Sequence, residues 1–262
     1  MSITSYESLA ARLRDAYAGS AVAPLRDGLD PADGAGAYAV QDINTRFWGE
    51  TGRRIVGRKI GLTAKAVQAQ LGVDQPDYGA LFADMQIEEG GILPADKVIQ
   101  PKAEAEVALV LAQDITKASV TPADIAAATD YAVAAIEIVD SRIADWKITF
   151  ADTVADNGSS AFFVLGKEGK KLDGLDLFTC GMALEINDAI VSVGAGAACL
   201  GHPLNAAAWL ARVMIANGTP LKAGDILLTG ALGPMAAISP GDQVKASIGG
   251  LGTVSFSYGK GA

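Results

Sequence analysis

The stretch Pro101–Asp140 reads PKAEAEVALVLAQDITKASVTPADIAAATDYAVAAIEIVD and contains two apolar runs. The first run, 107–111, directly follows Glu104 and Glu106, and the second run, 133–139, carries Glu137 between two isoleucines. Because alternate side chains of a strand share a face, Glu104 and Glu106 project from the same side of the predicted strand. Buried carboxylates on one face repel each other and lose hydration unless a cation lies between them. The stretch therefore predicts two core strands that together carry a site for a hard cation.

The available ligand types narrow the choice of metal. The chain has one histidine and two cysteines, Cys180 and Cys199, which are not in a metal-binding spacing, so the usual nitrogen and sulfur site for zinc cannot be assembled. Carboxylate ligands with open coordination positions suit Mg²⁺ or Mn²⁺. Two other interpretations stay open at this point. The first two glutamates could lie on a solvated sheet face, or Glu137 could pair with Arg142 or Lys102.

Composition excludes several classes of function. A chain of 262 residues suits one large domain or two small ones. The net charge of -9 and the sequence pI of about 4.6, without any basic run, argue against nucleic-acid binding. No apolar stretch is long enough for a membrane span, and the charged N-terminal segment does not resemble a signal peptide. We therefore expect a cytoplasmic protein with no membrane or nucleic-acid partner.

The order of predicted elements indicates an α+β fold. Helices are expected over 4–18 and 37–49, with a loop over 30–36 between them, and a strand is expected over 54–60. Thr63 is expected to cap a third helix, and Thr121 a fourth. The C-terminal third predicts one helix over 203–217 among short strands, namely 161–165, 181–186, 189–193, 225–229, 243–248 and 253–258. We expect a mainly helical N-terminal region, 1–65, and a metal-binding catalytic β-rich domain, 66–262.

Three further features are candidates for the site. In the predicted strand RIVGRKI, either Arg58 or Lys59 points inward, and an inward lysine would have a lowered pKa suited to acid–base work. Asp77 lies in QPDYG, where the pattern by itself favours a turn-forming aspartate. The segment TVADNGSS, 153–160, packs hydroxyls, an acid and an amide ahead of an apolar strand. Such a turn binds a small polar ligand or bonds to its own backbone.

Several segments, taken together and in order, resemble the 2-hydroxypenta-2,4-dienoate (2-keto-4-pentenoate) hydratases of the fumarylacetoacetate-hydrolase-like superfamily. The resemblance extends from about Pro24 to Phe256, nearly the whole chain. The segments that carry it are GRKIGLTAKAVQAQLGVDQPDYGALFADM (57–85), PKAEAEVALVL (101–111), AIEIVDSRIADWKI (135–148), DTVADNGSS (152–160), GHPLNAAAWLA (201–211) and LLTGALGPM (227–235).

The resemblance implies a fold, a reaction and a set of site residues. The fold would be a helical N-terminal part followed by a mixed β-sandwich or roll that holds a divalent metal, Mg²⁺ or Mn²⁺. The reaction would be that of a hydro-lyase in the meta-cleavage degradation of aromatic compounds, hydrating the dienol to 4-hydroxy-2-oxopentanoate. The implied residues are metal ligands Glu104, Glu106 and Glu137, a catalytic pair Lys59 and Asp77, and substrate contacts Ser160 and Lys147.

Three alternatives accompany this interpretation. A 2-oxo-3-hexenedioate (4-oxalocrotonate) decarboxylase shares the metal chemistry, although the segments DTVADN and LLTGALGPM favour the hydratase. An acylpyruvate hydrolase of the same superfamily is the second alternative, and a non-catalytic partner subunit is the third. The resemblance also implies a homo-oligomer and possible association with other enzymes of the pathway.

Overall fold

The computed structural model describes residues 3–260, and its N-terminal part is helical. Helices α1 (Ile3–Ala16) and α2 (Gly34–Glu50) pack with α5 (Phe150–Ala155) around a small apolar cluster that includes Leu13 and Val40. Helix α2 begins at Gly34, so the prediction of a loop through residue 36 was wrong. The reason is the cap, because the Asp33 carboxylate accepts a hydrogen bond from the Gly36 amide at 2.8 Å.

The remaining helices lie between strands. Helix α4 (Pro122–Ala128) begins as predicted, with Thr121 and Asp124 forming a capping box. Helix α6 (Pro203–Ala216) follows His202, whose Nδ1 accepts from the Leu204 amide. Helix α3 (Lys65–Leu71) has Ala64 at its N-cap position, so the prediction that Thr63 caps this helix was wrong. Thr63 is buried beside Gly230 instead.

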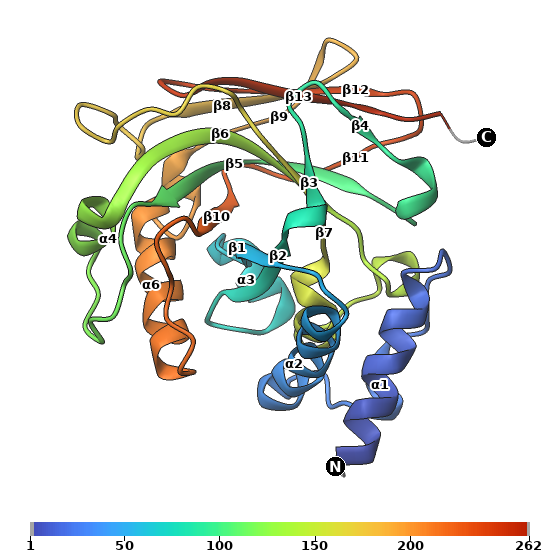
Figure 1. Cartoon of the computed structure of the whole chain (residues 1–262). Coiled ribbons are helices and arrows are strands. Elements are labelled where there is room, and N and C mark those ends of the chain that lie inside the picture. Colours follow the sequence, from blue (N-terminus) through green and yellow to red (C-terminus); the bar gives the residue numbers. More distant parts are fainter. Residues whose placement is uncertain (1–2, 261–262) are drawn as a thin grey trace.

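An eight-stranded sheet forms the frame of the molecule (Figure 1). Its central strand β5 is antiparallel to both of its neighbours, β6 and β10, and β1 pairs in parallel with β10. The spatial order of the strands is β2 (Asp77–Phe82), β1 (Ile55–Gly61), β10 (Ile226–Ala231), β5 (Lys102–Leu111), β6 (Thr129–Val139), β7 (Ser160–Leu165) and β3 (Gln86–Ile87), with β11 (Ala236–Ala237) also on β5.

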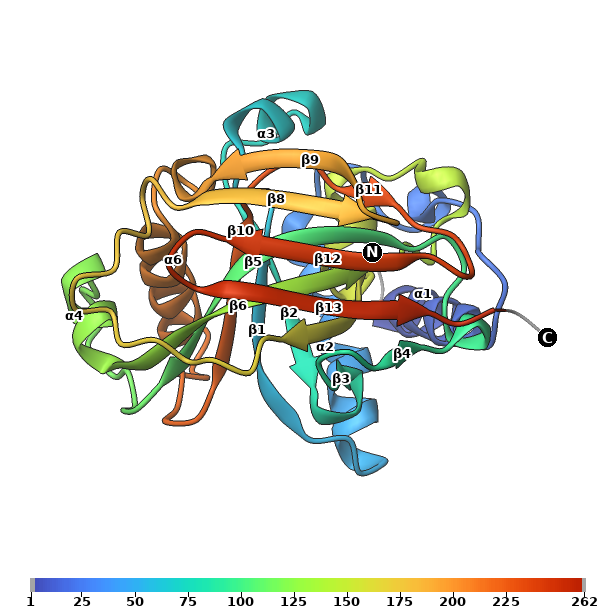
Figure 2. The same cartoon turned by 90° about the horizontal axis from the view of Figure 1, so that it is seen from above.

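A second, five-stranded sheet lies across the first (Figure 2). Figure 1 shows it on the outer side of the arch made by β5 and β6, while the helices α1, α2 and α6 lie on the other side. The order of its strands is β4 (Ile92–Leu93), β13 (Gly252–Tyr258), β12 (Gln243–Ile248), β8 (Gly181–Ile186) and β9 (Ala189–Ala195). The predicted α+β class and the mixed sandwich are both confirmed.

The alternation of side chains on β5 and β6 separates the core from the site. Val107 and Ile136 point toward the small sheet and belong to the main apolar core, together with Phe256 of β13. The residues next to them on each strand point to the inner side of the arch. The inner side near β10 is apolar, with Ala108 and Leu228 in a third cluster. The three glutamates of β5 and β6 lie on this inner side.

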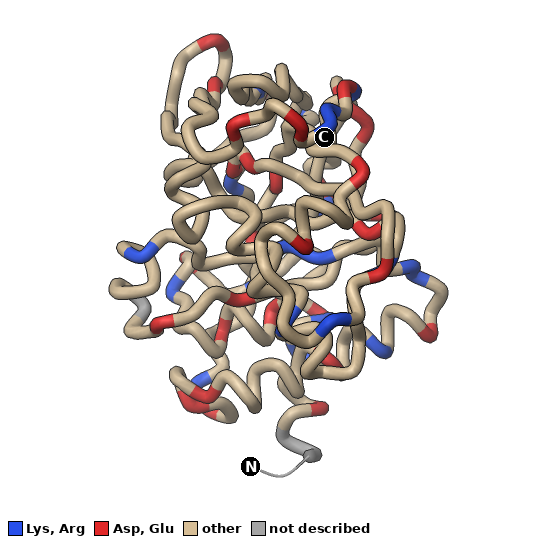
Figure 3. Tube along the Cα trace, turned by 90° about the vertical axis from the view of Figure 1, so that its left-hand side faces the viewer, with Lys and Arg blue, Asp and Glu red and all other residues tan. Residues whose placement is uncertain are grey.

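The distribution of charged residues along the chain agrees with the composition. Figure 3 shows acidic and basic positions interspersed along the trace, with no cluster of lysine and arginine on the side in view. Across residues 3–260, no helix has the length and hydropathy required to cross a bilayer.

Strand β1, on the N-terminal side of the predicted domain boundary at residue 65, is part of the large sheet. The boundary itself stays a prediction.

Candidate metal and catalytic site

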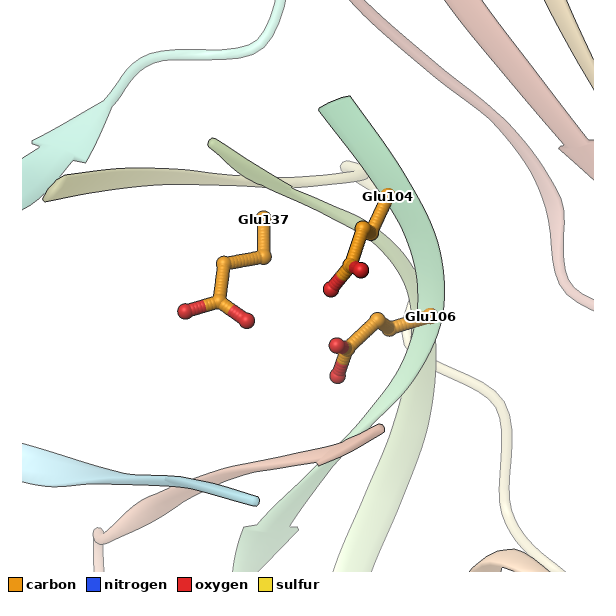
Figure 4. A group of neighbouring side chains, drawn as sticks. All are labelled: Glu104, Glu106 and Glu137. Atoms are coloured by element: carbon orange, nitrogen blue, oxygen red, sulfur yellow. The ribbon is translucent and has the colours of Figure 1, made fainter. Parts of the chain in front are cut away.

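Three carboxylates converge on the inner side of the arch (Figure 4). Glu104 and Glu106 leave β5 on the same face, and Glu137 stands directly opposite Glu104 in the pairing of β5 with β6. Each side chain offers one oxygen, and these oxygens all lie within 4.8 Å of one another. Glu106 and Glu137 are fully buried, whereas Glu104 keeps partial exposure. The alternative that Glu104 and Glu106 lie on a solvated sheet face is therefore wrong for Glu106.

The oxygen atoms of this cluster fit a hard cation. Glu106 Oε2 accepts a hydrogen bond from the Gly230 amide at 2.8 Å, but Glu106 Oε1 and both oxygens of Glu137 accept none from the described residues. Buried acceptors without donors are costly, and carboxylate oxygens are the ligands that Mg²⁺ and Mn²⁺ prefer. The three residues Glu104, Glu106 and Glu137 would hold such a cation and leave coordination positions open.

Lys59 is the inward residue of β1. Its side chain is buried, and its ammonium lies 3.4 Å from Glu137 Oε2 and donates to the Gly158 carbonyl at 2.9 Å. The alternative in which Glu137 pairs with Arg142 or Lys102 was wrong. Arg142 pairs with Asp156, Nε to Oδ1 at 2.6 Å. The ammonium of Lys102 lies over the Trp146 ring instead.

Asp77 is the first residue of β2, not a turn residue as its local pattern favours. It stands opposite Gly61 in the pairing of β1 with β2, and its side chain is buried. Its Oδ1 has no hydrogen-bond partner in the part of the chain that the structure describes. The pairing brings this oxygen and the Lys59 ammonium close to Gly61. A Cβ added to Gly61 would lie 2.3 Å from Asp77 Oδ1 and 3.0 Å from Lys59 Nζ.

Burial and mutual repulsion raise the pKa values of the acids. For Glu104, burial and then the charge of Glu137 raise the pKa to about 7. The pKa of Glu106 is raised well above its ordinary value by burial and by the other two carboxylates. Burial also raises the pKa of Asp77 and of Glu137, although the nearby Lys59 ammonium opposes both shifts. A cation that binds here near neutral pH must displace the proton from the fraction of Glu104 that is still protonated.

The pKa of Lys59 moves in the direction opposite to the prediction. Burial by itself lowers the pKa of the amine, as the sequence pattern led us to expect. The attraction of the surrounding carboxylates, Glu137 first and then Asp77, Glu104 and Glu106, outweighs burial, and the net shift is upward. Without a metal ion, Lys59 is therefore the counter-charge of the cluster and holds its proton at neutral pH.

The pH dependence of stability follows from the raised pKa of Glu104. Between its ordinary value of 4.5 and its folded value of about 7, the folded protein binds more protons than the unfolded chain. The free energy of unfolding should therefore fall as pH rises through this window, by roughly 3 kcal/mol at most for this group. Urea unfolding in EDTA at pH 5, 6, 7 and 8 measures the slope, and Mn²⁺ should restore stability most at pH 8.

Glu104→Gln is the variant that isolates this contribution, because the amide does not titrate. Its free energy of unfolding should change less with pH in EDTA than that of the wild type, and Mn²⁺ should stabilise it less. Equal slopes for the two proteins would contradict the shifted pKa of Glu104.

The space between Lys59 and Asp77 is kept open by Gly61. Gly61→Ala should lower the turnover of the dienol hydration that the sequence resemblance implies by at least about tenfold. The new methyl group must displace the Asp77 carboxylate, the Lys59 ammonium or both. Gly181→Ala is the matched control, because an added Cβ at this strand start meets no atom within 4 Å. Steady-state rates, with circular dichroism to verify the fold, measure the effect. Equal rates for the two variants would show that the pair tolerates displacement.

The two predicted substrate contacts differ in position. Ser160 begins β7, is buried, and lies near enough to Glu137 to help lower the pKa of that carboxyl. Its Oγ has no hydrogen-bond partner of normal geometry among the described residues. The side chain of Lys147 is 68% exposed and pairs with Asp145 at 2.8 Å. None of the hydrogen bonds or ion pairs of Lys147 reaches the carboxylate cluster, so the structure does not bring it to the site.

Sequence reasoning missed the groups that hold these side chains in place. The Gly158 carbonyl and the Gly230 amide are backbone groups, and the residue type does not indicate that a backbone group has such a role. Asn157 was noticed only as part of a polar turn. Its amide bonds to both the N–H and the C=O of Ala80 on β2, at 2.7 and 2.9 Å. The signal that could have found it is an asparagine beside a glycine, a pair suited to left-handed backbone.

Comparisons with known proteins agree with the geometry. The family described as "Fumarylacetoacetate (FAA) hydrolase C-terminal" matches residues 55–257. The sequence is 60% identical to the 2-keto-4-pentenoate hydratase 1 of Dechloromonas aromatica, in an alignment that covers 98% of each chain. It is 56% identical to the 2-keto-4-pentenoate hydratase of Burkholderia vietnamiensis, over 97% of both chains.

A solved structure is also very similar. The 4-oxalocrotonate decarboxylase from Pseudomonas putida G7, complexed with magnesium and adipate, superposes with a TM-score of 0.94. The two chains are 34% identical, and the match covers 98% of each. This chain and the decarboxylase therefore share the fold and the arrangement of helices and strands.

Proposed function

We propose that this chain, which belongs to the 2-keto-4-pentenoate hydratase family of the fumarylacetoacetate hydrolase superfamily, is a hydro-lyase that converts 2-hydroxypenta-2,4-dienoate to 4-hydroxy-2-oxopentanoate. The observation that carries the proposal is the buried cluster of three carboxylates with unbonded oxygens beside Lys59 and Asp77. The identity of 60% to a named hydratase over nearly the whole chain supports the choice of reaction.

Glu104, Glu106 and Glu137 would hold Mg²⁺ or Mn²⁺. When bound, the divalent cation supplies positive charge for the enolate that forms as the dienol becomes a ketone. The oxygen-only donor set and the unbonded buried oxygens support this assignment.

Lys59 and Asp77 are the acid–base pair. The dienol hydroxyl loses its proton, C5 gains one, and the resulting C3=C4 double bond is conjugated with the new ketone. Water then adds at C4, with a proton taken from the water and another delivered to C3. In the first step we assign the donor role to the Lys59 ammonium, which holds its proton among the acids, and the acceptor role to Asp77, whose Oδ1 accepts no hydrogen bond from the described residues. In the hydration step the roles reverse: the neutral Lys59 amine takes the proton from water, and the Asp77 carboxylic acid delivers its proton to C3, so that both groups end as they began.

Burial makes this pair effective. Lys59 and Asp77 are almost fully excluded from water, at 3% and 1% relative exposure. Proton transfers inside such a site avoid competition from bulk solvent. The buried Ser160 hydroxyl, which has no regular hydrogen-bond partner, is available to the substrate carboxylate. Lys147 is left outside this assignment.

The test is an assay with freshly generated 2-hydroxypenta-2,4-dienoate and Mg²⁺ or Mn²⁺, following loss of the ultraviolet band of the dienol. We expect turnover that EDTA abolishes and a product heavier by one water in the mass spectrum. No turnover with either metal would overturn the proposed function.

A second candidate is decarboxylation of 2-oxo-3-hexenedioate, favoured by the similarity to the 4-oxalocrotonate decarboxylase structure. The same assay with this dicarboxylate decides between the two, because the decarboxylase reaction releases carbon dioxide. The acylpyruvate hydrolase alternative has weaker support, since relatives named as hydratases are 52–60% identical over most of the chain. Self-association, association with pathway enzymes and a cytoplasmic location stay predictions from the sequence.

A further inference from the structure

The turn between α5 and β7 has an unusual backbone. Asn157, Gly158 and Ser159 have φ angles of 57°, 61° and 54°, so three successive residues lie in the left-handed region. Left-handed backbone is disfavoured for residues with a Cβ, and consecutive examples are rare. Such a conformation persists only where its surroundings hold it, and it marks sites where the backbone itself has a task.

The turn directs one carbonyl at the site. The Gly158 oxygen accepts a hydrogen bond from the Lys59 ammonium at 2.9 Å. An ideal Cβ on Gly158 would lie 3.1 Å from Lys59 Cδ and 3.4 Å from Asp77 Oδ1, so the turn lies tightly against both catalytic candidates. The Gly158 carbonyl is the neutral acceptor that fixes the Lys59 ammonium, while Glu137 attracts it from 3.4 Å.

Asn157 ties the turn to the strand that carries Asp77. Its Oδ1 accepts from the Ala80 amide at 2.7 Å, and its Nδ2 donates to the Ala80 carbonyl at 2.9 Å. Both bonds are buried, and Ala80 lies three residues beyond Asp77 on β2. The side chain therefore satisfies both backbone groups of one strand residue and sets the distance between the turn and β2.

Arg142 holds the turn from the other side. Its Nη2 donates to the Asp156 carbonyl at 2.8 Å and to the Ser160 carbonyl at 3.1 Å, the two residues that flank the turn. Its Nε pairs with the Asp156 carboxylate, and the guanidinium is almost fully buried. Arg142 thus holds the two residues that flank the turn, and the Asn157 side chain holds its first residue.

We propose that the left-handed turn 157–159 positions Lys59, and that Asn157 is a positioning residue that acts through the Gly158 carbonyl. By locking the turn to β2, Asn157 keeps the Lys59 ammonium and the Asp77 carboxylate at a fixed separation. It touches no reacting atom, and its effect is on the orientation of the proton donor.

Asn157→Gly tests this role because glycine keeps the left-handed backbone and removes only the amide. The matched control is Asn187→Gly in the hairpin between β8 and β9. Asn187 has a φ of 52° and also makes two side-chain hydrogen bonds, to Asp242 and to the Gln243 amide, but is exposed. We expect kcat of Asn157→Gly to fall about 10- to 100-fold, with KM and the Mn²⁺ Kd within about threefold of wild type. Asn187→Gly should match the wild type.

A second measurement needs no substrate. The rate at which acetic anhydride labels Lys59, read by peptide mass spectrometry against the exposed Lys245, should rise at least about fivefold in Asn157→Gly and stay unchanged in Asn187→Gly. The kinetic measurement rests on the proposed function, whereas the labelling does not. A wild type without hydratase activity would therefore refute the function and leave labelling to decide the positioning. Wild-type labelling in Asn157→Gly would overturn the proposal, as would a kcat loss matched by equal loss of Mn²⁺ affinity.

Discussion

Lys59→Met is expected to lower kcat by about 10²- to 10⁴-fold, the usual contribution of a positioned proton donor or acceptor. Methionine keeps the length and apolar stem of the side chain but cannot carry the proton. Because the Lys59 ammonium is also the counter-charge of Glu137 at 3.4 Å, its removal should destabilise the metal-free protein. Divalent cation should restore that stability, since it replaces the lost positive charge.

Steady-state kinetics and thermal unfolding, each with and without Mn²⁺, measure the two effects. Lys245→Met is the matched control, because Lys245 also lies on a strand and pairs with a glutamate, Glu185, at 2.8 Å, but on the surface. Turnover of Lys59→Met within threefold of wild type would remove Lys59 from the acid–base pair. A melting temperature that Mn²⁺ fails to raise would instead contradict its role as counter-charge.

Glu106→Gln is expected to weaken Mn²⁺ binding by at least about 100-fold and to lower turnover in proportion at subsaturating metal. Glu106 is fully buried, and one of its oxygens already accepts from the Gly230 amide, while the other has no donor within residues 3–260. The neutral amide removes a negative charge from the site and presents an NH₂ group where a ligand oxygen is needed.

Isothermal titration with Mn²⁺ and assays over a range of Mn²⁺ concentrations separate affinity from catalysis. Glu185→Gln provides the same chemical change at the surface ion pair with Lys245 and should leave both quantities unchanged. Full activity of Glu106→Gln in metal-depleted buffer would refute the metal-dependent part of the mechanism.

The carboxylate cluster could be predicted from sequence because its geometry is local. Alternation on one strand places Glu104 and Glu106 together, and an acid between two isoleucines in the next strand could be expected to face the same way. The structure places Glu137 directly opposite Glu104, and both strands are longer than their apolar runs indicated. The alternating pattern could not establish that the glutamates are buried, because their burial depends on the helices and strands that close the inner side of the arch.

The acid–base pair required more than local pattern. The sequence of β1 allowed either Arg58 or Lys59 to face inward, and the motif around Asp77 favoured a turn. The inward orientation of Lys59 and the strand position of Asp77 depend on long-range pairing. Strand β1 lies between β2 and β10, and these two strands fix its orientation. The local pattern left both residues open as candidates, and only the resemblance to a known family favoured a catalytic role for them. Lys147 shows the opposite case, because this resemblance-based candidate directly follows the 3₁₀ helix Ala144–Trp146 and pairs on the surface with Asp145.

The order of the strands in the large sheet has a kinetic consequence for folding. Glu104, Glu106 and Glu137 meet through the pairing of β5 with β6, which are consecutive in the chain and joined by residues 112–128 with helix α4. Lys59 reaches them only after β1 has paired with β10, near the other end of the chain. Pairings of high contact order form slowly. We therefore expect the three acids to be assembled during refolding before the lysine that neutralises them, and divalent cation in the refolding buffer to speed the late phase by reducing their repulsion.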